Sequence, residues 1–334
     1  MKKPLAVFET LTDLEGKLSI KEAFARDVLI GLSSNPKRIS SKYFYDTEGS
    51  RLFQKITDLP EYYLTRCEFE IFEYHKEAIA EILHEESFNL VELGPGDARK
   101  TRILLKYFLE EGLDFEYIPI DISESALEGL TASMGVEFPE LRVHGLVSEY
   151  FNALNWLKNL NHRRNVVLFL GSSIGNFNRD SSRIFLQSLW NCLNPGDYAL
   201  IGFDLKKDIE LLLKAYNDSR GTTREFNLNL LRRINRELCG NFEIDRFRHF
   251  ASYNVFSGAM ESYLVSKEIQ TIMVQDIGQS FSFDPWEPIH TEYSYKYLES
   301  DIVKLAEDTG FAPVEQFYDP AKFFTDVLWR VEKH

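Results

Sequence analysis

Residues 88–101 read FNLVELGPGDARKT, an apolar run that ends in an acid and leads into a glycine turn. Residues 102–109 then repeat apolar side chains with the spacing of a helix. Strand, glycine turn and helix in this order form a ligand site at the carboxyl end of the first strand of an open α/β sheet. Glycine suits the turn because the backbone must bend sharply and approach a ligand with no Cβ in the way. A lone G-x-G also occurs in ordinary strand-to-helix turns, so the rest of the chain must decide between these interpretations.

Strands and helices alternate regularly from residue 65 to residue 205. Such apolar strands, separated by helices, indicate a parallel sheet that is covered on both faces. Beyond residue 205, two helices are followed by short strand-like stretches, which predicts a second, mixed α+β domain. We therefore assign residues 65–205 to a nucleotide-type domain and residues 1–64 plus 206–334 to a second domain. The predicted strands of the first domain are 89–93, 115–121, 141–147, 165–170 and 198–204, and those near the carboxyl end are 312–317 and 323–331.

The composition narrows the class of protein. With 334 residues and 44% hydrophobic side chains the chain can bury a large core, and its net charge of −14 argues against a nucleic-acid partner. No apolar run approaches membrane-spanning length, and residues 1–11 do not resemble a signal sequence. The three cysteines lie far apart and the seven histidines are scattered, which predicts neither disulfides nor a metal site. We expect a cytoplasmic protein with a small-molecule substrate and no obligate protein partner.

The residues around the glycine turn favour one of three nucleotide cofactors. A dinucleotide site requires a glycine where Arg99 stands, and the GK[ST] ending of a P-loop is absent. S-adenosylmethionine remains, and Asp121 at the end of the second strand is placed to accept both ribose hydroxyl protons. Glu149 ends the third strand beside Tyr150, so that the acid can accept from the adenine amine while the ring covers the base. Alternatively, either acid is a helix N-cap with no ligand.

Several long segments have an unusual composition, and together they cover nearly the whole chain. They are KYFYDTEGSRLFQKITDLPEYYLTR, VELGPGDARKTRILL, YIPIDISESAL, LFLGSSIGNF, IGFDLKKD, AYND, EFNLNLLRRINREL and HTEYSYKY. In these segments the sequence resembles the histidine-specific Nα-methyltransferases, which make trimethylhistidine (hercynine) on the route to ergothioneine. The resemblance implies a class I methyltransferase sheet of the Rossmann-like type, a mixed α+β substrate domain, S-adenosylmethionine as methyl donor and no metal.

The resemblance also implies which residues hold the two ligands. The cofactor would be held by Gly94, Lys100, Asp121, Glu149 and Tyr150, where the last two replace the family's usual Asp-Phe pair. The carboxylate and amine of the amino acid would be held by Tyr62, Asn176 and Tyr216, with Tyr45 as the residue that orients or deprotonates the amine. Without the resemblance, the spacing of Tyr45 and Tyr62 favours a packed aromatic segment whose hydroxyls reach water or backbone.

The imidazole of the substrate would be held by Glu292 and Ser294, which alternate across one residue and so share a face of a strand. A carboxylate accepts from one ring nitrogen and a hydroxyl donates to the other, which fixes one tautomer. By spacing alone, Glu292 would be interpreted as a solvated surface acid. Ser262 stands where the family usually has methionine, and it leaves more room beside the substrate side chain. The alternatives are therefore an enzyme for another amino acid such as tryptophan, and a non-catalytic S-adenosylmethionine binder.

Overall fold

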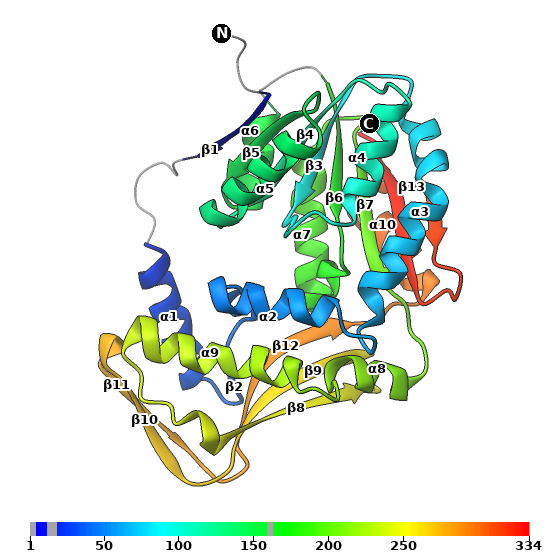
Figure 1. The fold of residues 1–334 in the computed structure, drawn as a ribbon. Coiled ribbons are helices and arrows are strands. Elements are labelled where there is room, and N and C mark those ends of the chain that lie inside the picture. The colour runs from blue at the N-terminus through cyan, green and yellow to red at the C-terminus, as the bar shows by residue number, and fades with distance from the viewer. Residues whose placement is uncertain (1–4, 12–18, 159–162, 334) are drawn as a thin grey trace. The chain divides into compact units, whose positions relative to one another are not determined.

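The chain consists of two compact units in the computed structural model, which describes residues 5–11, 19–158 and 163–333. Unit 1 comprises the described residues within 1–14, 66–205 and 297–334, and unit 2 comprises those within 15–65 and 206–296 (Figure 1). The first four residues of the amino-terminal stretch, to which the signal-sequence prediction applies, lie outside the described residues.

Unit 1 is built on an eight-stranded sheet with the order β1-β5-β4-β3-β6-β7-β14-β13. The strands from β1 to β7 in this order are parallel, whereas β14 runs antiparallel to both β7 and β13. This arrangement confirms the predicted α/β fold class with a Rossmann-like sheet. The bounds are β1 Ala6–Thr10, β3 Phe88–Leu93, β4 Phe115–Asp121, β5 Arg142–Val147, β6 Arg164–Phe169, β7 Tyr198–Asp204, β13 Phe311–Tyr318 and β14 Phe324–Val331.

Helices cover both faces of this sheet (Figure 1). Helix α5 lies against β1, β4 and β5, while α7 packs against α6 and α10. Two-sided burial explains why β3 and β7 are buried at every position and read as continuous apolar runs. The helices of unit 1 are α3 Tyr63–Leu83, α4 Thr101–Glu110, α5 Glu124–Glu137, α6 Tyr150–Leu157, α7 Arg179–Cys192 and α10 Glu299–Thr309, with a 3₁₀ turn η2 at Ser173–Asn176.

The carboxyl-terminal segment corrects the predicted domain division. The sequence assigned residues 206–334 to the second domain, but β13 and β14 complete the large sheet of unit 1. The physical reason is the pairing of β14 with β7 along its length, from Phe324 opposite Asp204 to Arg330 opposite Tyr198. Strand β1, which the sequence pattern missed, pairs with β5 and places the start of the chain in unit 1 as well.

Unit 2 is a mixed α+β structure, as predicted. Its four-stranded sheet has the order β2-β12-β9-β8, with a separate hairpin of β10 and β11. Helix α9 packs on β8 and β9, α2 packs on α9, and α8 packs on β8 and β9. The strands are β2 Lys37–Arg38, β8 Phe247–Asn254, β9 Ala259–Ser266, β10 Gln270–Val274, β11 Gln279–Phe283 and β12 Pro288–Tyr295. The helices are α1 Ile20–Ser33, α2 Thr47–Thr57, α8 Ile209–Tyr216 and α9 Thr222–Leu238, with 3₁₀ turns η1 Ser41–Phe44, η3 Ile244–Arg246 and η4 Gln275–Ile277.

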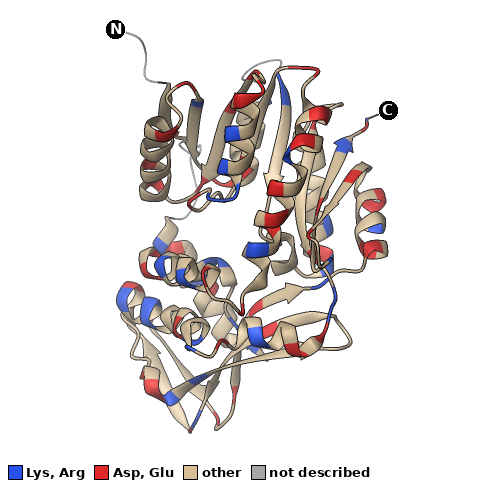
Figure 2. Ribbon diagram, turned by 45° about the vertical axis from the view of Figure 1, so that its right-hand side comes forward, with Lys and Arg blue, Asp and Glu red and all other residues tan. Residues whose placement is uncertain are grey.

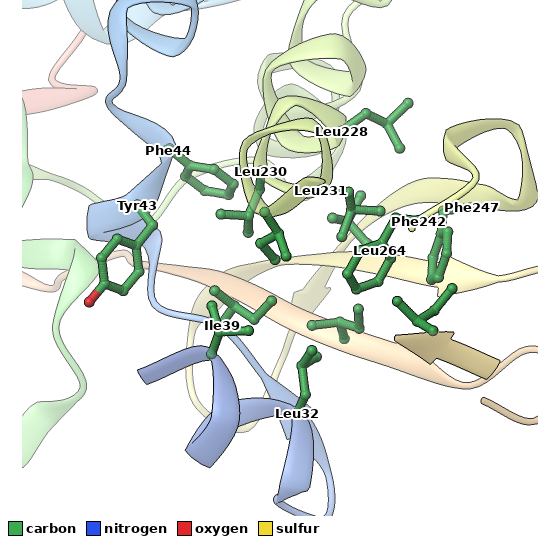
Figure 3. Close-up of a cluster of buried hydrophobic side chains, with 14 of the residues drawn as sticks. Leu32, Ile39, Tyr43, Phe44, Leu228, Leu230, Leu231, Phe242, Phe247 and Leu264 are labelled. Atoms are coloured by element: carbon green, nitrogen blue, oxygen red, sulfur yellow. The ribbon is translucent and has the colours of Figure 1, made fainter. Parts of the chain in front are cut away.

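A hydrophobic core holds unit 2 together between α9 and the sheet. Leu230 and Leu231 of α9 project toward the strand that carries Leu264, and Phe44 packs beside them (Figure 3). All four side chains are fully removed from solvent. Burial of each is worth about 1.5–3 kcal/mol, so this core fixes the position of α9 over the sheet.

Charged side chains lie mainly on helices and at strand ends, with both signs interspersed (Figure 2). Among the described residues, no helix has the length and apolarity needed to cross a membrane. The cysteines are free thiols, buried at Cys67 and Cys192 and exposed at Cys239.

Candidate functional site

The glycine turn after β3 is shaped by its own backbone and by one aromatic side chain. Gly94 has a φ of +68°, which L side chains rarely adopt, and its N–H donates to the carbonyl of Ile120 at 2.9 Å. A Cβ on Gly94 would lie 2.8 Å from the hydroxyl oxygen of Tyr150. Both the positive φ and the close approach of Tyr150 therefore require glycine at this position. Tyr150 is the first residue of α6, so the turn lies against the start of that helix. The structure thus brings together Gly94 and Tyr150, two of the residues predicted to hold the cofactor.

Neither predicted acid makes the side-chain hydrogen bond of a helix N-cap. The cap of α5 is Ser123, whose hydroxyl accepts from the N–H of Ala126, while a carboxylate oxygen of Asp121 accepts from the N–H of Ser123 at 2.9 Å. Burial raises the pKa of Asp121. Glu149 occupies the cap position of α6, yet its side chain makes no capping bond and is exposed. The N-cap interpretation is therefore wrong for Asp121, whereas Glu149 does stand at the N-cap position of α6 but leaves its carboxylate unused by the helix, and its contact with the cofactor stays a prediction.

Lys100 forms an ion pair within unit 1. Its ammonium contacts Glu68, a residue of α3 with no exposed surface, and the other oxygen of Glu68 accepts from the N–H of Gly171 at 2.7 Å. Burial opposes the charge on Lys100, but the Glu68 carboxylate outweighs it and raises the pKa of the lysine. Burial and the charge of Glu68 also raise the pKa of Asp326 well above its ordinary value. Lys100 thereby links the start of α4 to α3 and to the turn after β6, and its predicted contact with the cofactor stays a prediction.

The buried carboxylate of Glu92 connects elements next to the glycine turn. Glu92, just before the glycine turn, accepts from the hydroxyls of Thr101 at 2.7 Å and Tyr117 at 2.5 Å. Burial raises the pKa of Glu92 to about 7, although both hydrogen bonds oppose the shift. Since Thr101 begins α4 and Tyr117 lies on β4, Glu92 fixes the two elements that flank the turn.

In unit 2, the predicted residues for the substrate side chain share one face of the sheet. Glu292 of β12 lies directly opposite Ser262 of β9, and Ser262 lies opposite Ala251 of β8. Residues that face one another across strands project to the same side, so these three side chains form one row. In the next row, Ser294 lies opposite Met260, a buried methionine two residues from the position where the family usually has one.

Ser294 belongs to a buried network of hydrogen bonds. The hydroxyl of Tyr216 donates to the Ser294 oxygen at 2.6 Å, and the ammonium of Lys296 donates to Ser294 at 2.8 Å and to Tyr216 at 2.9 Å. Lys296 is only 2% exposed. Burial raises the pKa of Glu292 to about 7, and the charge of Lys296 opposes this rise. The network joins two predicted substrate-binding residues, Tyr216 and Ser294, through a lysine that sequence reasoning missed, and the charge of that lysine also acts on Glu292.

The two tyrosines near the amino end of unit 2 lie in one aromatic cluster. The ring of Phe53 meets Tyr45 with 5.5 Å between centroids and Tyr62 with 6.2 Å, both edge-on. Phe226 of α9 also contacts Tyr45, at 5.8 Å. Tyr45 is 40% exposed. Asn176, the remaining predicted substrate residue, closes the turn η2 in unit 1.

Two residues missed in the sequence carried a readable signal. Lys296 continues the alternation of Glu292 and Ser294, so a two-residue period places it on the same face of β12. Glu68 interrupts a helical stripe of apolar residues that includes Leu64 and Ile71, and an acid in such a stripe indicates a buried charge with a partner. Within the described residues, no group of three or more potential metal ligands is present.

Comparisons with known proteins agree with this geometry. A family model described as "Histidine-specific methyltransferase, SAM-dependent" matches residues 24–331. Histidine N-alpha-methyltransferase of Mycolicibacterium smegmatis is 36% identical over 92% of this chain and 94% of its own length. Ergothioneine biosynthesis protein 1 of Neurospora crassa is 37% identical over 84% of this chain and 32% of its own. A more distant relative, 4-dimethylallyltryptophan N-methyltransferase of Claviceps fusiformis, is 26% identical over 97% of this chain and 92% of its own length.

Proposed function

This chain belongs to the histidine-specific, S-adenosylmethionine-dependent methyltransferase family, and we propose that it methylates the α-amino nitrogen of L-histidine. Three successive transfers would give Nα,Nα,Nα-trimethylhistidine, the intermediate expected on a route to ergothioneine. The observation that carries the proposal is the array of Glu292, Ser294, Lys296 and Tyr216 on one face of unit 2. We further propose that the enzyme acts in the cytoplasm on the free amino acid, without a protein partner.

The residues of unit 1 fit S-adenosylmethionine, which supplies a methyl group already activated on a sulfonium. Gly94 leaves the backbone bare where a ligand must approach closely, and Asp121 stands at the end of β4 as an acceptor for ribose hydroxyls. Glu149 would accept from the adenine amine beside the Tyr150 ring. Burial raises the pKa of Tyr150, which keeps its phenol protonated. We retain Lys100 as a cofactor-binding residue, whose ammonium is positioned by Glu68.

The array in unit 2 fits an imidazole because it offers one acceptor and one donor. The oxygen of Ser294 already accepts from Tyr216 and Lys296, so its own proton is directed elsewhere and is available to an unprotonated ring nitrogen. Glu292 shares this face of β12 with Ser294 and can accept from the other ring nitrogen. Lys296 favours the ionised carboxylate because its charge opposes the rise in the pKa of Glu292.

Catalysis is proposed to depend on positioning. The attacking amine must be neutral and in line with the methyl carbon, and such positioning can account for about 7–11 kcal/mol of the barrier. The α-amine of a free amino acid is largely protonated at neutral pH, so only its small unprotonated fraction can attack, and the site must favour that form. Tyr62, Asn176 and Tyr216 would hold the carboxylate and amine, and Tyr45 would orient the amine. The aromatic faces of Tyr45 and Tyr62 also suit the growing methylammonium through cation–π attraction.

A panel of the twenty amino acids with methyl-labelled S-adenosylmethionine tests the proposal. We expect label in histidine alone, and a product heavier by three methyl groups. The specific rival is tryptophan, because Ser262 is small beside Glu292 and one relative is named for a tryptophan derivative. Label in tryptophan rather than histidine would replace the substrate assignment. Cofactor binding by calorimetry with no labelled amino acid would instead indicate a non-catalytic binder.

A further inference from the structure

A cavity of about 560 Å³ opens in unit 2 beside the loop that joins α8 to α9. Its wall is formed by residues 217–221, the first turn of α9, the start of β8 and the end of β9. Four lining side chains are cationic and one is a carboxylate: Arg220, Arg224, Arg248 and Lys267 against Asp218. In a chain with a net charge of −14, this is a local concentration of positive charge.

The carboxylate does not neutralise these cations, because it is used by the start of α9. Asp218 accepts from the N–H groups of Thr222 at 2.8 Å and Thr223 at 2.7 Å. Burial opposes its charge, but these backbone donors outweigh burial and lower the pKa of Asp218. Lys267 donates to the backbone carbonyl of Asp245, a neutral group, and so keeps its charge.

Arg224 forms an ion pair at the edge of the cavity wall, with Glu225 at 3.2 Å. Both side chains of that pair are well exposed, so the pair is weak and open to exchange. Glu61 also lies beside the cavity, where its carboxylate accepts from the N–H and the hydroxyl of the lining residue Ser219. The four cations therefore exceed the three nearby carboxylates, of Asp218, Glu225 and Glu61, by one positive charge.

A buried imidazole lies in the same wall. His249 is 8% exposed, and its Nε2 atom has no hydrogen-bond partner among the described residues. Burial lowers the pKa of His249 to about 4, so the ring is neutral at pH 7 and carries one N–H. A buried ring nitrogen without a partner is unfavourable by roughly 1–3 kcal/mol, and an anionic oxygen in the cavity would relieve this.

We propose that this cavity is a binding site for a phosphate-bearing small molecule. Guanidinium groups present paired N–H donors that match phosphate oxygens, and Arg220 of the α8–α9 loop, Arg224 of α9 and Arg248 of β8 all line the cavity. A phosphoryl group has enough oxygens and charge to engage several cations while one oxygen accepts from His249. The volume lies in the range of small-ligand sites, and it exceeds the need of a single phosphate ion.

Calorimetry at constant ionic strength tests the site with inorganic phosphate, pyrophosphate, ADP and citrate. We expect pyrophosphate and ADP to bind more tightly than phosphate, and citrate to bind at least about tenfold more weakly than pyrophosphate. R220Q and R248Q should each raise the pyrophosphate dissociation constant about tenfold or more. K55Q is the matched control, since Lys55 is an exposed cation of unit 2 on α2, outside the cavity wall.

Nuclear magnetic resonance of the unaltered protein provides a second readout that does not depend on the folding of a variant. Saturation with pyrophosphate should shift the Nε2 resonance of His249 and raise the pKa of that ring from about 4. Three results would overturn the proposal: an unchanged Nε2 resonance, equal affinity in R248Q and K55Q, or citrate binding as tightly as pyrophosphate. Absence of any binding would overturn it as well.

Discussion

Replacing Glu292 with glutamine removes one charge and nearly preserves the shape of the side chain. We expect this change to raise the free energy of unfolding and to weaken the binding of histidine. Burial raises the pKa of Glu292 to about 7, from an ordinary value of 4.5. Between these two pH values the folded state binds more protons at this site than the unfolded state. The contribution of Glu292 to stability is therefore lost as pH rises from 4.5 to 7, and it stays lost above pH 7.

The magnitude follows from the difference of 2.5 between those two values. At 1.36 kcal/mol for each unit, the ionised carboxylate destabilises the folded state by about 3 kcal/mol at pH 8. By the same linkage, ionisation at this site destabilises the folded state by only about 1 kcal/mol at pH 5. Since glutamine carries no charge, E292Q should be more stable than the unaltered protein by about these amounts.

Urea unfolding at pH 5 and pH 8 measures the difference directly. E268Q is the control, since Glu268 is an exposed acid of the same unit and its loss should change stability by less than about 0.5 kcal/mol. In the methylation assay, E292Q loses a charge-assisted hydrogen bond to the imidazole, so KM for histidine should rise about 10- to 100-fold with cofactor affinity unchanged. Equal stability of E292Q and the unaltered protein at pH 8 would refute the burial argument, and an unchanged KM would refute the substrate role.

Three further substitutions test the remaining parts of the site. K296M removes the cation that favours ionised Glu292, so the rise of kcat/KM for histidine with pH should move to higher pH; superimposable profiles would contradict this. G94A places a Cβ 2.8 Å from the Tyr150 hydroxyl at a φ of +68°, and calorimetry should show roughly tenfold weaker S-adenosylhomocysteine binding. S262M fills the space opposite Glu292, and the ratio of kcat/KM for histidine over tryptophan should increase about tenfold; an unchanged ratio would show that this position does not control side-chain choice.

The parallel part of the large sheet was predictable because burial on both faces leaves a continuous apolar run in the sequence. Each of the five predicted strands agrees with an observed strand within one residue at either end. The place of the carboxyl-terminal hairpin was not predictable, because the pairing of β14 with β7 joins segments about 120 residues apart and leaves no trace in local periodicity. The short edge strand β1 at Ala6–Thr10 was missed, since five residues with one covered face carry little pattern.

The acids and glycines of the site were predictable for a different reason. Parallel strands end at the same edge of a sheet, so the amino-acid sequence is enough to group Gly94, Asp121 and Glu149. Buried ion pairs do not follow from such a rule. The contact of Lys100 with Glu68 depends on where α3 lies against α4, and sequence alone shows two charges without showing that they meet.

The hydrogen-bond directions around Ser294 decide between the two candidate substrates more firmly than the available space does. Tyr216 and Lys296 both donate to the Ser294 oxygen, which leaves the hydroxyl proton of Ser294 available to an acceptor on the substrate. A neutral imidazole offers one N–H to Glu292 and one lone pair to Ser294, whereas an indole offers an N–H and no acceptor. Tryptophan would therefore leave the Ser294 donor without a partner in a buried site, which is unfavourable by roughly 1–3 kcal/mol. Since Lys296 is what fixes the direction of the Ser294 proton, K296M should also narrow the preference for histidine over tryptophan, and an unaltered preference would show that this network does not select the ring.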